Sequence, residues 1–522
     1  MSSRAAFWWA AVTGVVAAIV VLGLAEVLAL FFGSAASPLF AVGSLVIDLA
    51  PPGVKDLMIT LFGTGDKAVL FVLMGIVLVV ISGLAGLAER RRPPLGIVLF
   101  GLGCLLGLVA VLTRAGATGF LGVPVIVGAV AGVVVLRVGI DRLGRWEDAA
   151  ERREAASGAA AAGPQFERRR FLTMTLVAGG IALLAGSGAR VVNAMTAAVT
   201  ELRSKIVLPK AAVAEPPVPA AARLDVAGIS PYVTPNSDFY RIDTALQVPS
   251  VDSASWRLRV TGLVENEVEI DFAELLAKPL VEHMTTLACV SNDVGGDLIG
   301  NALWLGYPIR ELLAEAKPAA GADMVLSTSI DGFTAGTPLD VLQDEGTQAL
   351  LAVGMNGEPL PLEHGFPVRM VVPGLYGYVS ATKWVVELEV TRFADAEGYW
   401  TPRGYDAKGP VKLASRIDTP VSGAALKTGS RVPVAGVAWD QHVGVAGVEV
   451  RVDNGPWQSA RLADSVSADT WRQWVYEWMP ERGSHVLEVR ATSVDGTTQS
   501  PDYVPPAPNG AEGWHSITVQ VA

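Results

Sequence analysis

The chain contains few of the residues that hold metal centres in proteins. Its 522 residues include two cysteines, Cys104 and Cys289, and five histidines, none of which precedes His283. Two cysteines are too few for a cysteine-built iron–sulfur cluster, a c-type haem attachment or a four-cysteine zinc site. The long histidine-free stretch also lacks the imidazole pair that a b-type haem needs. We therefore expect no haem and no iron–sulfur cluster in this chain, and any redox centre must use very few protein ligands.

Charge is scarce and has the wrong sign for nucleic acids. Lys and Arg number 40 against 51 Asp and Glu, which gives a net charge of −11, and no basic stripe is evident. Affinity for DNA or RNA comes largely from neutralised phosphates, so we exclude nucleic acid as a partner. Only 17% of the residues are charged, whereas 51% are hydrophobic. This composition is too apolar for an ordinary soluble chain, so part of it is expected in membrane lipid.

The apolar residues gather in the first third of the chain. The stretch 38–62 is interrupted by charges and prolines, which indicates an interfacial piece rather than a complete span. Basic residues follow the apolar runs 68–88 and 115–136, so the loops after these two runs are expected in the cytoplasm. Everything after residue 189 then lies outside the cytoplasm, in a multi-pass protein of the cell membrane. Uncharged runs of about 20 residues, the length that crosses a bilayer, predict transmembrane helices at 5–25, 68–88, 93–113, 115–136 and 171–189.

Two consecutive arginines, Arg168 and Arg169, precede the last of these runs, and Phe171 and Leu172 follow them. This pattern is typical of a twin-arginine export signal, which is used for domains that cross a membrane already folded. The alternative is an ordinary cluster of cytoplasmic positive charges. Because an alanine-rich linker precedes the motif and a large polar region follows it, we favour the signal. The predicted order is four transmembrane helices (1–148), a cytoplasmic linker with the motif (149–170), the fifth transmembrane helix (171–189) and an extracytoplasmic linker (190–229).

The second half of the chain has the patterns of two water-facing domains. Residues 230–412 mix alternating apolar strands with short helices at 272–277 and 308–316, which predicts an α+β domain. From residue 413 to 522 the pattern is one of short strands separated by turns. Strands at this spacing over about 100 residues are typical of a β-sandwich. The fold class is therefore multi-domain, with a helical membrane region, an α+β domain and a C-terminal β-sandwich.

Cys289 is the first candidate for chemistry, because it stands where a strand-like run breaks into a glycine-rich loop. Cys104 lies in the third predicted span and cannot pair with it across the membrane boundary. A free thiol outside the cytoplasm is exposed to oxidation, so Cys289 needs a reason to be there. It is either a small buried hydrophobe, or a thiolate that acts as nucleophile or ligand to a soft metal.

Several blocks of sequence resemble the sulfite oxidase family of molybdenum enzymes. The similarity is strongest around Cys289, in residues 286–292, and in the block 355–369. It continues in residues 415–417, 436–439 and 513–516, which resemble the family's C-terminal immunoglobulin-like dimerisation domain. The resemblance covers roughly 230–522 and leaves out the membrane half. It implies a sulfite-oxidase-type molybdopterin-binding catalytic domain over 230–412 and an immunoglobulin-like domain over 413–522.

The resemblance also implies roles for individual residues. Cys289 would ligate molybdenum, and one thiolate suffices where a pterin dithiolene supplies the other sulfurs. Tyr405 and Arg241 would assist catalysis. Without the motifs, each charged residue would be read as a surface or inter-strand charge. The residues expected to bind the molybdenum–molybdopterin cofactor are Arg241, Asn292, Asp331, His364, Arg369, Ser380 and Lys383.

The sequence departs from the family where a substrate anion would bind. Sulfite oxidases carry arginines in the loop after the cysteine, but here Asn292 is followed by Asp293, Val294 and two glycines. Without cationic side chains a sulfite dianion should bind poorly. A sulfoxide or N-oxide is therefore expected as the substrate at least as strongly as sulfite. The predicted function is two-electron oxygen-atom transfer on a small molecule by a membrane-anchored extracytoplasmic enzyme. The alternatives are a sulfite dehydrogenase of the same family and a cofactor-free, membrane-tethered binding module.

The expected partners follow from the same reasoning. With no second redox centre predicted in the chain, electrons must be exchanged with an external donor or acceptor, such as a cytochrome, a quinone or a partner subunit. The membrane helices contact lipid. The dimerisation-type domain suggests a homodimer. Whether it forms in a chain that is already tethered to the membrane is left open.

Overall fold

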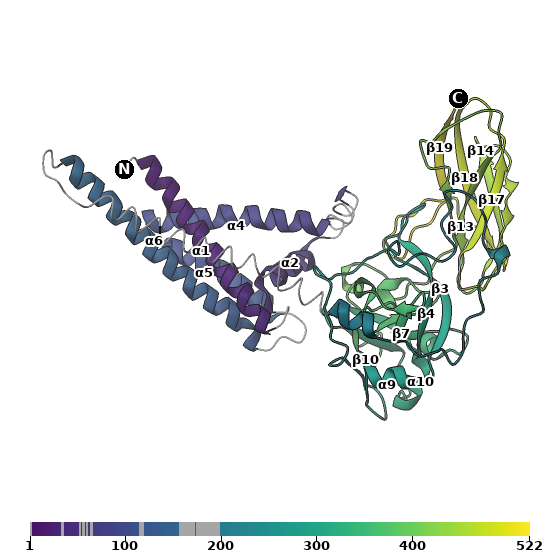
Figure 1. Cartoon of the computed structure of the whole chain (residues 1–522), viewed down its shortest axis with the longest axis horizontal. Coiled ribbons are helices and arrows are strands. Elements are labelled where there is room, and N and C mark those ends of the chain that lie inside the picture. The colour runs from purple at the N-terminus through teal and green to yellow at the C-terminus, as the bar shows by residue number, and fades with distance from the viewer. Residues whose placement is uncertain are drawn as a thin grey trace. The chain divides into compact units, whose positions relative to one another are not determined.

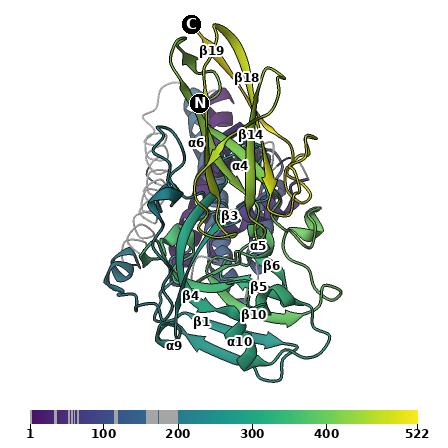
Figure 2. The same ribbon diagram turned by 90° about the vertical axis from the view of Figure 1, so that its right-hand side faces the viewer.

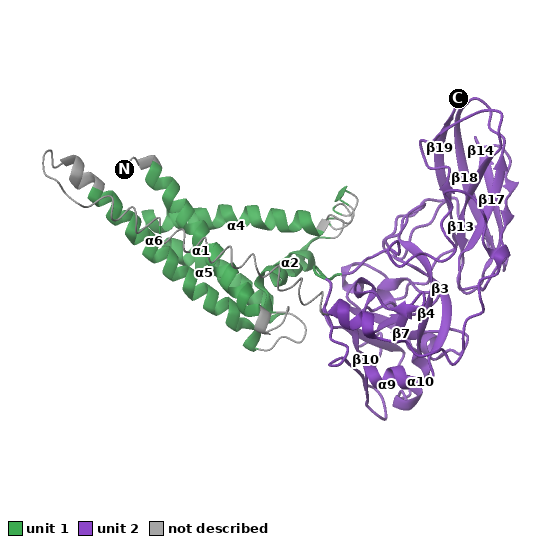
Figure 3. Ribbon diagram, in the orientation of Figure 1, with its two compact units in different colours: residues 1–198, 244–247 green, residues 199–243, 248–522 purple. Residues whose placement is uncertain are grey.

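The computed structural model describes residues 3–32, 36–51, 66–113, 119–155 and 199–522, together with the single positions 54, 58, 61, 62 and 173. The chain forms two compact units (Figure 3). The first comprises residues 1–198 and 244–247, and the second residues 199–243 and 248–522. The twin-arginine motif at Arg168 and Arg169 and the predicted fifth helix lie outside the described residues, apart from position 173.

The first unit is helical. Four segments are long and apolar enough to cross a membrane, namely Ala5–Ala29, Lys67–Arg91, Leu95–Leu112 and Gly119–Ala149, and they coincide with the first four predicted spans. The last helix continues to Ala155, into the predicted linker 149–170. The helices of this unit are α1 (Ser3–Phe32), α2 (Pro38–Leu49), α4 (Asp66–Arg91), α5 (Leu95–Leu112) and α6 (Val123–Ala155), with a 3-10 turn η3 (Gly119–Gly122) before α6 (Figure 1).

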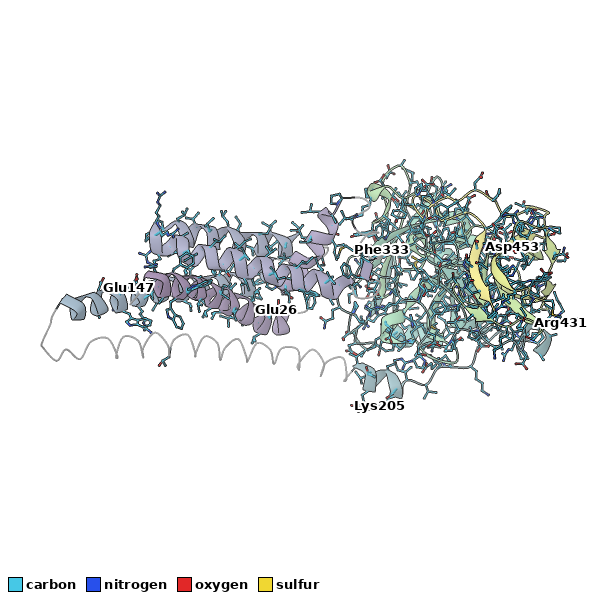
Figure 4. The ribbon with its side chains drawn as sticks, turned by 90° about the horizontal axis from the view of Figure 1, so that it is seen from above. Glu26, Glu147, Lys205, Phe333, Arg431 and Asp453 are labelled. Carbon is cyan, nitrogen blue, oxygen red and sulfur yellow. The ribbon has the colours of Figure 1, made fainter. Side chains whose placement is uncertain are left out.

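Polar side chains in this unit have structural partners. The Glu26 carboxylate of α1 accepts hydrogen bonds from the Ser37 hydroxyl at 2.7 Å and the Leu39 N–H at 3.1 Å, and thereby caps α2. Arg90 of α4 is ion-paired with Glu147 of α6 at 2.7 Å; Figure 4 labels Glu26 and Glu147. The 12-residue helix α2 is too short to span a bilayer, in agreement with the interfacial interpretation of 38–62.

The second unit begins with an α+β domain, residues 199–243 and 248–412. Its strands form two five-stranded sheets, one in the order β2-β1-β10-β5-β6 and one in the order β3-β4-β7-β8 with β9 paired to β7. The strands are β1 (Arg257–Gly262), β2 (Val268–Asp271), β3 (Val281–Ala288), β4 (Ile299–Pro308), β5 (Met324–Ser329), β6 (Thr334–Pro338), β7 (Leu350–Met355), β8 (Glu358–Pro359), β9 (Arg369–Val371) and β10 (Val385–Thr391). The helices are α9 (Phe272–Ala277), α10 (Ile309–Ala316) and α11 (Leu339–Gln343), with 3-10 turns η4 (Ala220–Ala222), η5 (Leu362–His364), η6 (Gly377–Val379) and η7 (Thr401–Arg403).

The sheet that contains β3 positions the candidate cysteine. β3 and β4 are antiparallel and in register, with Ala288 opposite Ile299. The chain between them, residues 289–298, is therefore a short connection at one end of the sheet. Trp304 and Phe366, both fully buried, lie in the core under this sheet. Because strand pairing and core packing hold both ends of the connection, Cys289 has a fixed place in the fold.

The C-terminal domain, residues 413–522, is a β-sandwich, as predicted. Its core contains Trp474, Leu487 and Val519, each fully buried between the sheets. One sheet has the order β11-β13-β17-β16 and the other β12-β19-β18-β14-β15, and Figures 1 and 2 show them face to face. The strands are β11 (Ala414–Thr419), β12 (Ala425–Leu426), β13 (Val432–Trp439), β14 (Val445–Val452), β15 (Gln458–Ser459), β16 (Arg461–Leu462), β17 (Arg472–Trp478), β18 (Gly483–Ser493) and β19 (His515–Val521).

Candidate active site

Cys289 follows β3 directly, and its thiol is buried, with 8% of the residue exposed. Its N–H donates to the Leu298 carbonyl at 2.9 Å, and its sulfur accepts from the Ser291 N–H at 3.4 Å. Burial raises the pKa of this thiol, while Ser291 and the Lys383 charge act in the opposite direction. The thiol is therefore protonated, and a metal must displace this proton to bind the sulfur. Among the described residues, no group of three His, Cys, Asp or Glu side chains could hold a metal.

Arg369 opens β9 and is buried, with 5% of the residue exposed. Its guanidinium donates to the carbonyls of Met370 and His364, both at 3.2 Å, and lies over the Trp304 ring at 5.1 Å. Within the described part of the chain no carboxylate lies within 4.0 Å of it, and burial lowers its pKa to about 10. A buried cation without a counter-ion is costly. The site therefore favours an anion beside Arg369.

Lys383 forms a second buried cation, joined to Arg241 through one carboxylate. The Lys383 ammonium contacts Asp243 at 2.7 Å, and the half-exposed Arg241 guanidinium contacts the same carboxylate at 2.8 Å. A Cβ at Gly365, whose φ is +110°, would lie 3.0 Å from the Cβ of Arg369 and 3.1 Å from that of Lys383. Glycine at this position thus allows the two buried cations to approach each other. Sequence reasoning did not identify this bridging role of Asp243.

His364 lies in η5 with 3% of the residue exposed. Its Nε2 contacts the Asn236 carbonyl at 3.0 Å, and its ring packs edge-on against Phe239. Burial lowers its pKa to about 4, helped by the positive charges of Arg369 and Lys383. The imidazole is therefore neutral at physiological pH and donates a hydrogen bond to Asn236, which leaves Arg369 and Lys383 as the buried positive charges of this region.

Three predicted cofactor residues make local backbone contacts. The Ser380 hydroxyl donates to the Tyr376 carbonyl at 2.9 Å. Asn292 Oδ1 accepts from the Leu298 N–H at 2.8 Å and so closes the loop after Cys289. Asp331 Oδ1 accepts from the Phe333 N–H at 3.3 Å in the turn between β5 and β6. These contacts shape the loops, and a direct role in cofactor binding stays a prediction for all three.

Two phenols, Tyr240 and Tyr376, interact electrostatically with Cys289. Sequence reasoning had named a different phenol, Tyr405. Burial raises the pKa of Tyr376 to about 12 and also raises that of Tyr240, and the Cys289 thiolate adds to both effects. Both phenols therefore stay protonated at neutral pH. Tyr405 packs against Tyr378 at a ring distance of 5.6 Å and against Trp400 at 5.2 Å. Its catalytic role stays a prediction. Closeness in sequence to predicted site residues, Arg241 for Tyr240 and Ser380 for Tyr376, was the signal that could have found the other two.

A small cleft lies beside the loop that follows Cys289. The loop from Asn292 to Gly295 and Tyr376 line one side, and Trp439 and Gln499 of the C-terminal domain line the other. Neither side contributes a lysine or an arginine, whereas Asp293 contributes a carboxylate, which accepts a hydrogen bond from the Tyr503 hydroxyl at 3.2 Å. The lining of the cleft is thus neutral to acidic.

The depressed pKa of Lys383 gives a prediction for the cofactor-free protein. Burial lowers this pKa from 10.5 to about 8, so between these pH values the unfolded chain binds more protons than the folded one. The free energy of unfolding should therefore rise with pH across this window, by at most about 3 kcal/mol. Lys383→Met keeps the volume and removes the titrating group, so it should lack the rise. Urea unfolding of both proteins from pH 7.5 to 10.5 checks this, and parallel pH dependences would contradict it.

Comparison with known proteins agrees with this geometry. Residues 245–400 match the oxidoreductase molybdopterin binding domain, and residues 414–519 match the bacterial Ig domain. The mitochondrial sulfite oxidase of Mus musculus is 29% identical over 341 residues, which cover 56% of this chain and 62% of that protein. The uncharacterized oxidoreductase YuiH of Bacillus subtilis (strain 168) is 34% identical over 158 residues, which cover 30% of this chain and 76% of that protein. The solved structure of the sulfane dehydrogenase SoxCD from Paracoccus pantotrophus has a TM-score of 0.48 and 21% identity, covering 57% of this chain and 83% of that one.

A buried thiol beside buried cations, within a domain that matches molybdopterin-binding oxidoreductases, defines a molybdenum oxidoreductase. The chain belongs to the sulfite oxidase family, which confirms the resemblance seen in the sequence. The chain spans about three fifths of the length of its mammalian relatives, 62% of the Mus musculus protein.

The described residues fit the cofactor of this family. A molybdopterin carries a phosphate, and Arg369 is a buried guanidinium that has no carboxylate partner in the part of the chain that the structure describes. The dithiolene of the pterin supplies soft sulfur ligands, so one further thiolate is enough, and Cys289 provides it. Arg369, Lys383 and Cys289 are therefore the residues of this chain that would hold the group.

Proposed function

We propose that the chain is a membrane-anchored molybdopterin oxidoreductase that transfers an oxygen atom to or from a small neutral molecule, a sulfoxide or an N-oxide. The observation that carries the proposal is the cleft beside Cys289, whose lining has the Asp293 carboxylate and no cationic side chain. A dianion such as sulfite would have to leave water without a positive partner there, which is unfavourable. A neutral S=O or N–O group carries no such cost.

The Arg416 guanidinium, which contacts the loop after Cys289, does not change this balance. Among the described residues, Arg416 contacts the loop through a hydrogen bond to the Gly296 carbonyl at 2.7 Å. Its Nε lies 2.6 Å from the Asp418 carboxylate, and its third nitrogen contacts Ser230. Arg416 is therefore neutralised by its own ion pair. The names of the curated relatives favour sulfite as the substrate, and the charge of the cleft opposes it.

The molybdenum cofactor would supply a two-electron couple, and the protein residues bind and orient. In the reducing direction the S=O or N–O bond breaks, two electrons and two protons are taken up, and the oxygen leaves as water. The oxidising direction reverses this balance, with water as the source of oxygen. Tyr240 and Tyr376 are protonated phenols near Cys289 and can donate hydrogen bonds to the substrate oxygen. Tyr405 and Arg241 are the further catalytic candidates.

The proposed location is the extracytoplasmic face of the cell membrane. Four apolar helices of spanning length support the anchor, and the basic residues after the second and fourth spans support the orientation. The Arg168–Arg169 motif supports export of the second unit in a folded, cofactor-loaded state. An external cytochrome, quinone or partner subunit would then exchange electrons with the site.

The substrate preference can be tested on the protein purified from its native membrane. In one assay, reduced methyl viologen donates electrons to the enzyme, and dimethyl sulfoxide or trimethylamine N-oxide reoxidises it. In the reverse assay, sulfite is oxidised and ferricyanide accepts the electrons. The kcat/KM for each oxide should be higher than that for sulfite. Asp293→Arg should lower the KM for sulfite about tenfold, since hydrogen bonds to charged groups contribute about 1.5–3 kcal/mol. Asp293→Asn is the control that removes the negative charge without adding a positive one.

Two results would overturn parts of the proposal. A wild-type kcat/KM for sulfite above that for both oxides would assign the alternative, a sulfite dehydrogenase of the same family. Absence of stoichiometric molybdenum from the natively purified protein would assign a membrane-tethered binding module.

A further inference from the structure

Two histidines of the second unit share one buried carboxylate. Asp469, in the loop between β16 and β17, contacts His283 Nε2 at 2.9 Å through one oxygen and His442 Nδ1 at 2.6 Å through the other. The Asp469 side chain is 11% exposed. His283 belongs to β3 of the α+β domain, and His442 follows β13 of the C-terminal domain. This cluster, called the His–Asp–His clamp below, is not used in the chemistry described above.

The loop that carries Asp469 also holds the backbone of β3. The Asp469 carbonyl accepts hydrogen bonds from the Thr286 N–H at 2.9 Å and the Thr285 hydroxyl at 3.2 Å. The Trp471 N–H donates to the Thr286 hydroxyl at 2.8 Å. Thr286 is three residues before Cys289 in the sequence. The C-terminal domain therefore fixes the strand end from which the thiol projects.

His442 reaches the other side of the site. In addition to Asp469 it donates to the Pro373 carbonyl. A Cβ on Gly374 would collide with His442 Nε2, so the ring lies directly against this backbone. Pro373 and Gly374 lead into Tyr376, the phenol that interacts with Cys289 and lines the cleft. Both ring nitrogens of His442 face acceptors, so each needs a proton to donate. Only the doubly protonated imidazolium makes both hydrogen bonds, to Asp469 and to Pro373.

We propose that the His–Asp–His clamp is a positioning device, by which the C-terminal domain sets the placement of Cys289 relative to Tyr376. The inference rests on the proposed function, since it assigns these two residues to one site. The clamp touches neither of them, and it acts through the backbone at Thr286 and at Pro373. A displacement of about 1 Å between reacting groups costs up to about 100-fold in rate.

The clamp should make activity depend on pH. Asp469 raises the pKa of His442 above its ordinary value, and its own pKa is lowered to about 2 by the two histidines. Glu215 lies 3.7 Å from His283 Nδ1. Asp344 acts on His442 and favours its protonated ring. A raised histidine pKa means that the ion pair is intact at low pH and is lost as the pH rises through that pKa. Activity should therefore fall on the alkaline side.

The test uses the detergent-solubilised holoenzyme and Asp469→Asn. With dimethyl sulfoxide and reduced methyl viologen, kcat should fall about tenfold or more, while molybdenum content stays at the wild-type level. The alkaline limb of the pH profile should move to lower pH, because His442 loses the carboxylate that raises its pKa. The Mo(V) paramagnetic resonance spectrum should change, since it reports the ligand geometry at the metal. Amide exchange at Thr286 and over residues 373–376 should accelerate.

The matched control is Asp453→Asn. His485 Nδ1 contacts Asp453 at 2.6 Å, the same distance as between His442 and Asp469, and its Nε2 contacts the Glu481 carbonyl at 2.9 Å, also in the C-terminal domain (Figure 4 labels Asp453). This variant should leave kcat, the pH profile, the spectrum and the exchange unchanged.

Each outcome separates the clamp from the proposed function. If Asp469→Asn keeps the wild-type kcat, pH limb and spectrum, the clamp is overturned and the proposed function stands. If the wild type holds no molybdenum, the proposed function falls, and the amide exchange alone decides on the clamp. If Asp469→Asn does not accumulate, His442→Gln is measured in its place. Failure of that variant as well, with a normal Asp453→Asn, assigns the cluster to folding alone and overturns the proposal.

Discussion

Replacing Cys289 with serine is expected to lower kcat by at least about 10³-fold and to leave the protein folded. A thiolate is a soft donor suited to molybdenum held by dithiolene sulfurs, whereas a serine hydroxyl is hard and stays protonated. A loss of about 4 kcal/mol in transition-state stabilisation corresponds to this factor. The fold should tolerate the change, because serine is smaller than cysteine and its oxygen can accept the hydrogen bond that the Ser291 N–H now gives to sulfur.

The measurement is kcat with dimethyl sulfoxide and reduced methyl viologen, together with molybdenum content and the thermal unfolding midpoint. Cys104→Ser is the matched control, because it makes the same exchange at the other free thiol, on α5 of the first unit. It should leave all three quantities unchanged. A Cys289→Ser enzyme that retained more than a tenth of the wild-type kcat would show that this sulfur is not the metal ligand.

Elements with local sequence signals could be predicted. The helix expected at 272–277 is α9, because Asp271 and Glu274 form a capping box at its first turn. β13 is one of the short strands expected after residue 413, and the turn after β14 places Asp453 and Asn454 at positive φ, as its Asp-Asn-Gly sequence indicates. In the α+β domain the apolar run from Pro367 to Val372 pairs only over Arg369–Val371. Pro367 has no N–H to give to a neighbouring strand, so pairing begins after it.

The interior of the site was predicted in part. The resemblance named Cys289, Arg369 and Lys383, and in the structure the charge of Lys383 acts on the Cys289 thiol and that of Arg369 on Lys383. Their roles in holding a cofactor stay predictions. The contacts that depend on the path of the whole chain were missed. Lys383 meets Asp243 across 140 positions of sequence, and His283 meets Asp469 across 186. No local periodicity signals such contacts, because they follow from how two sheets and two domains pack.

The buried charge at Arg369 leads to the second large effect, on cofactor content. Arg369→Met keeps an unbranched side chain of similar length and removes the cation. We expect molybdenum content to fall below about a tenth of the wild-type level, because the guanidinium that would pair with the cofactor phosphate is lost, and charged hydrogen bonds of this kind contribute about 1.5–3 kcal/mol each. Metal analysis of the two proteins, expressed in parallel in a cofactor-producing strain, measures this.

The same substitution should not destabilise the cofactor-free protein. Arg369 has no carboxylate within 4.0 Å among the described residues, so the folded apoprotein carries the cost of an unpaired buried charge, and a well-packed apolar side chain removes that cost. The urea midpoint of cofactor-free Arg369→Met should therefore equal or exceed that of cofactor-free wild type. Arg416→Met is the matched control at a buried guanidinium that is paired, with Asp418 at 2.6 Å. It leaves that buried carboxylate without its cationic partner, with the hydrogen bond from the Ser230 N–H at 2.9 Å still in place, which should cost about 3–5 kcal/mol. Equal destabilisation by both substitutions would show that Arg369 is a structural cation rather than one held ready for an anion.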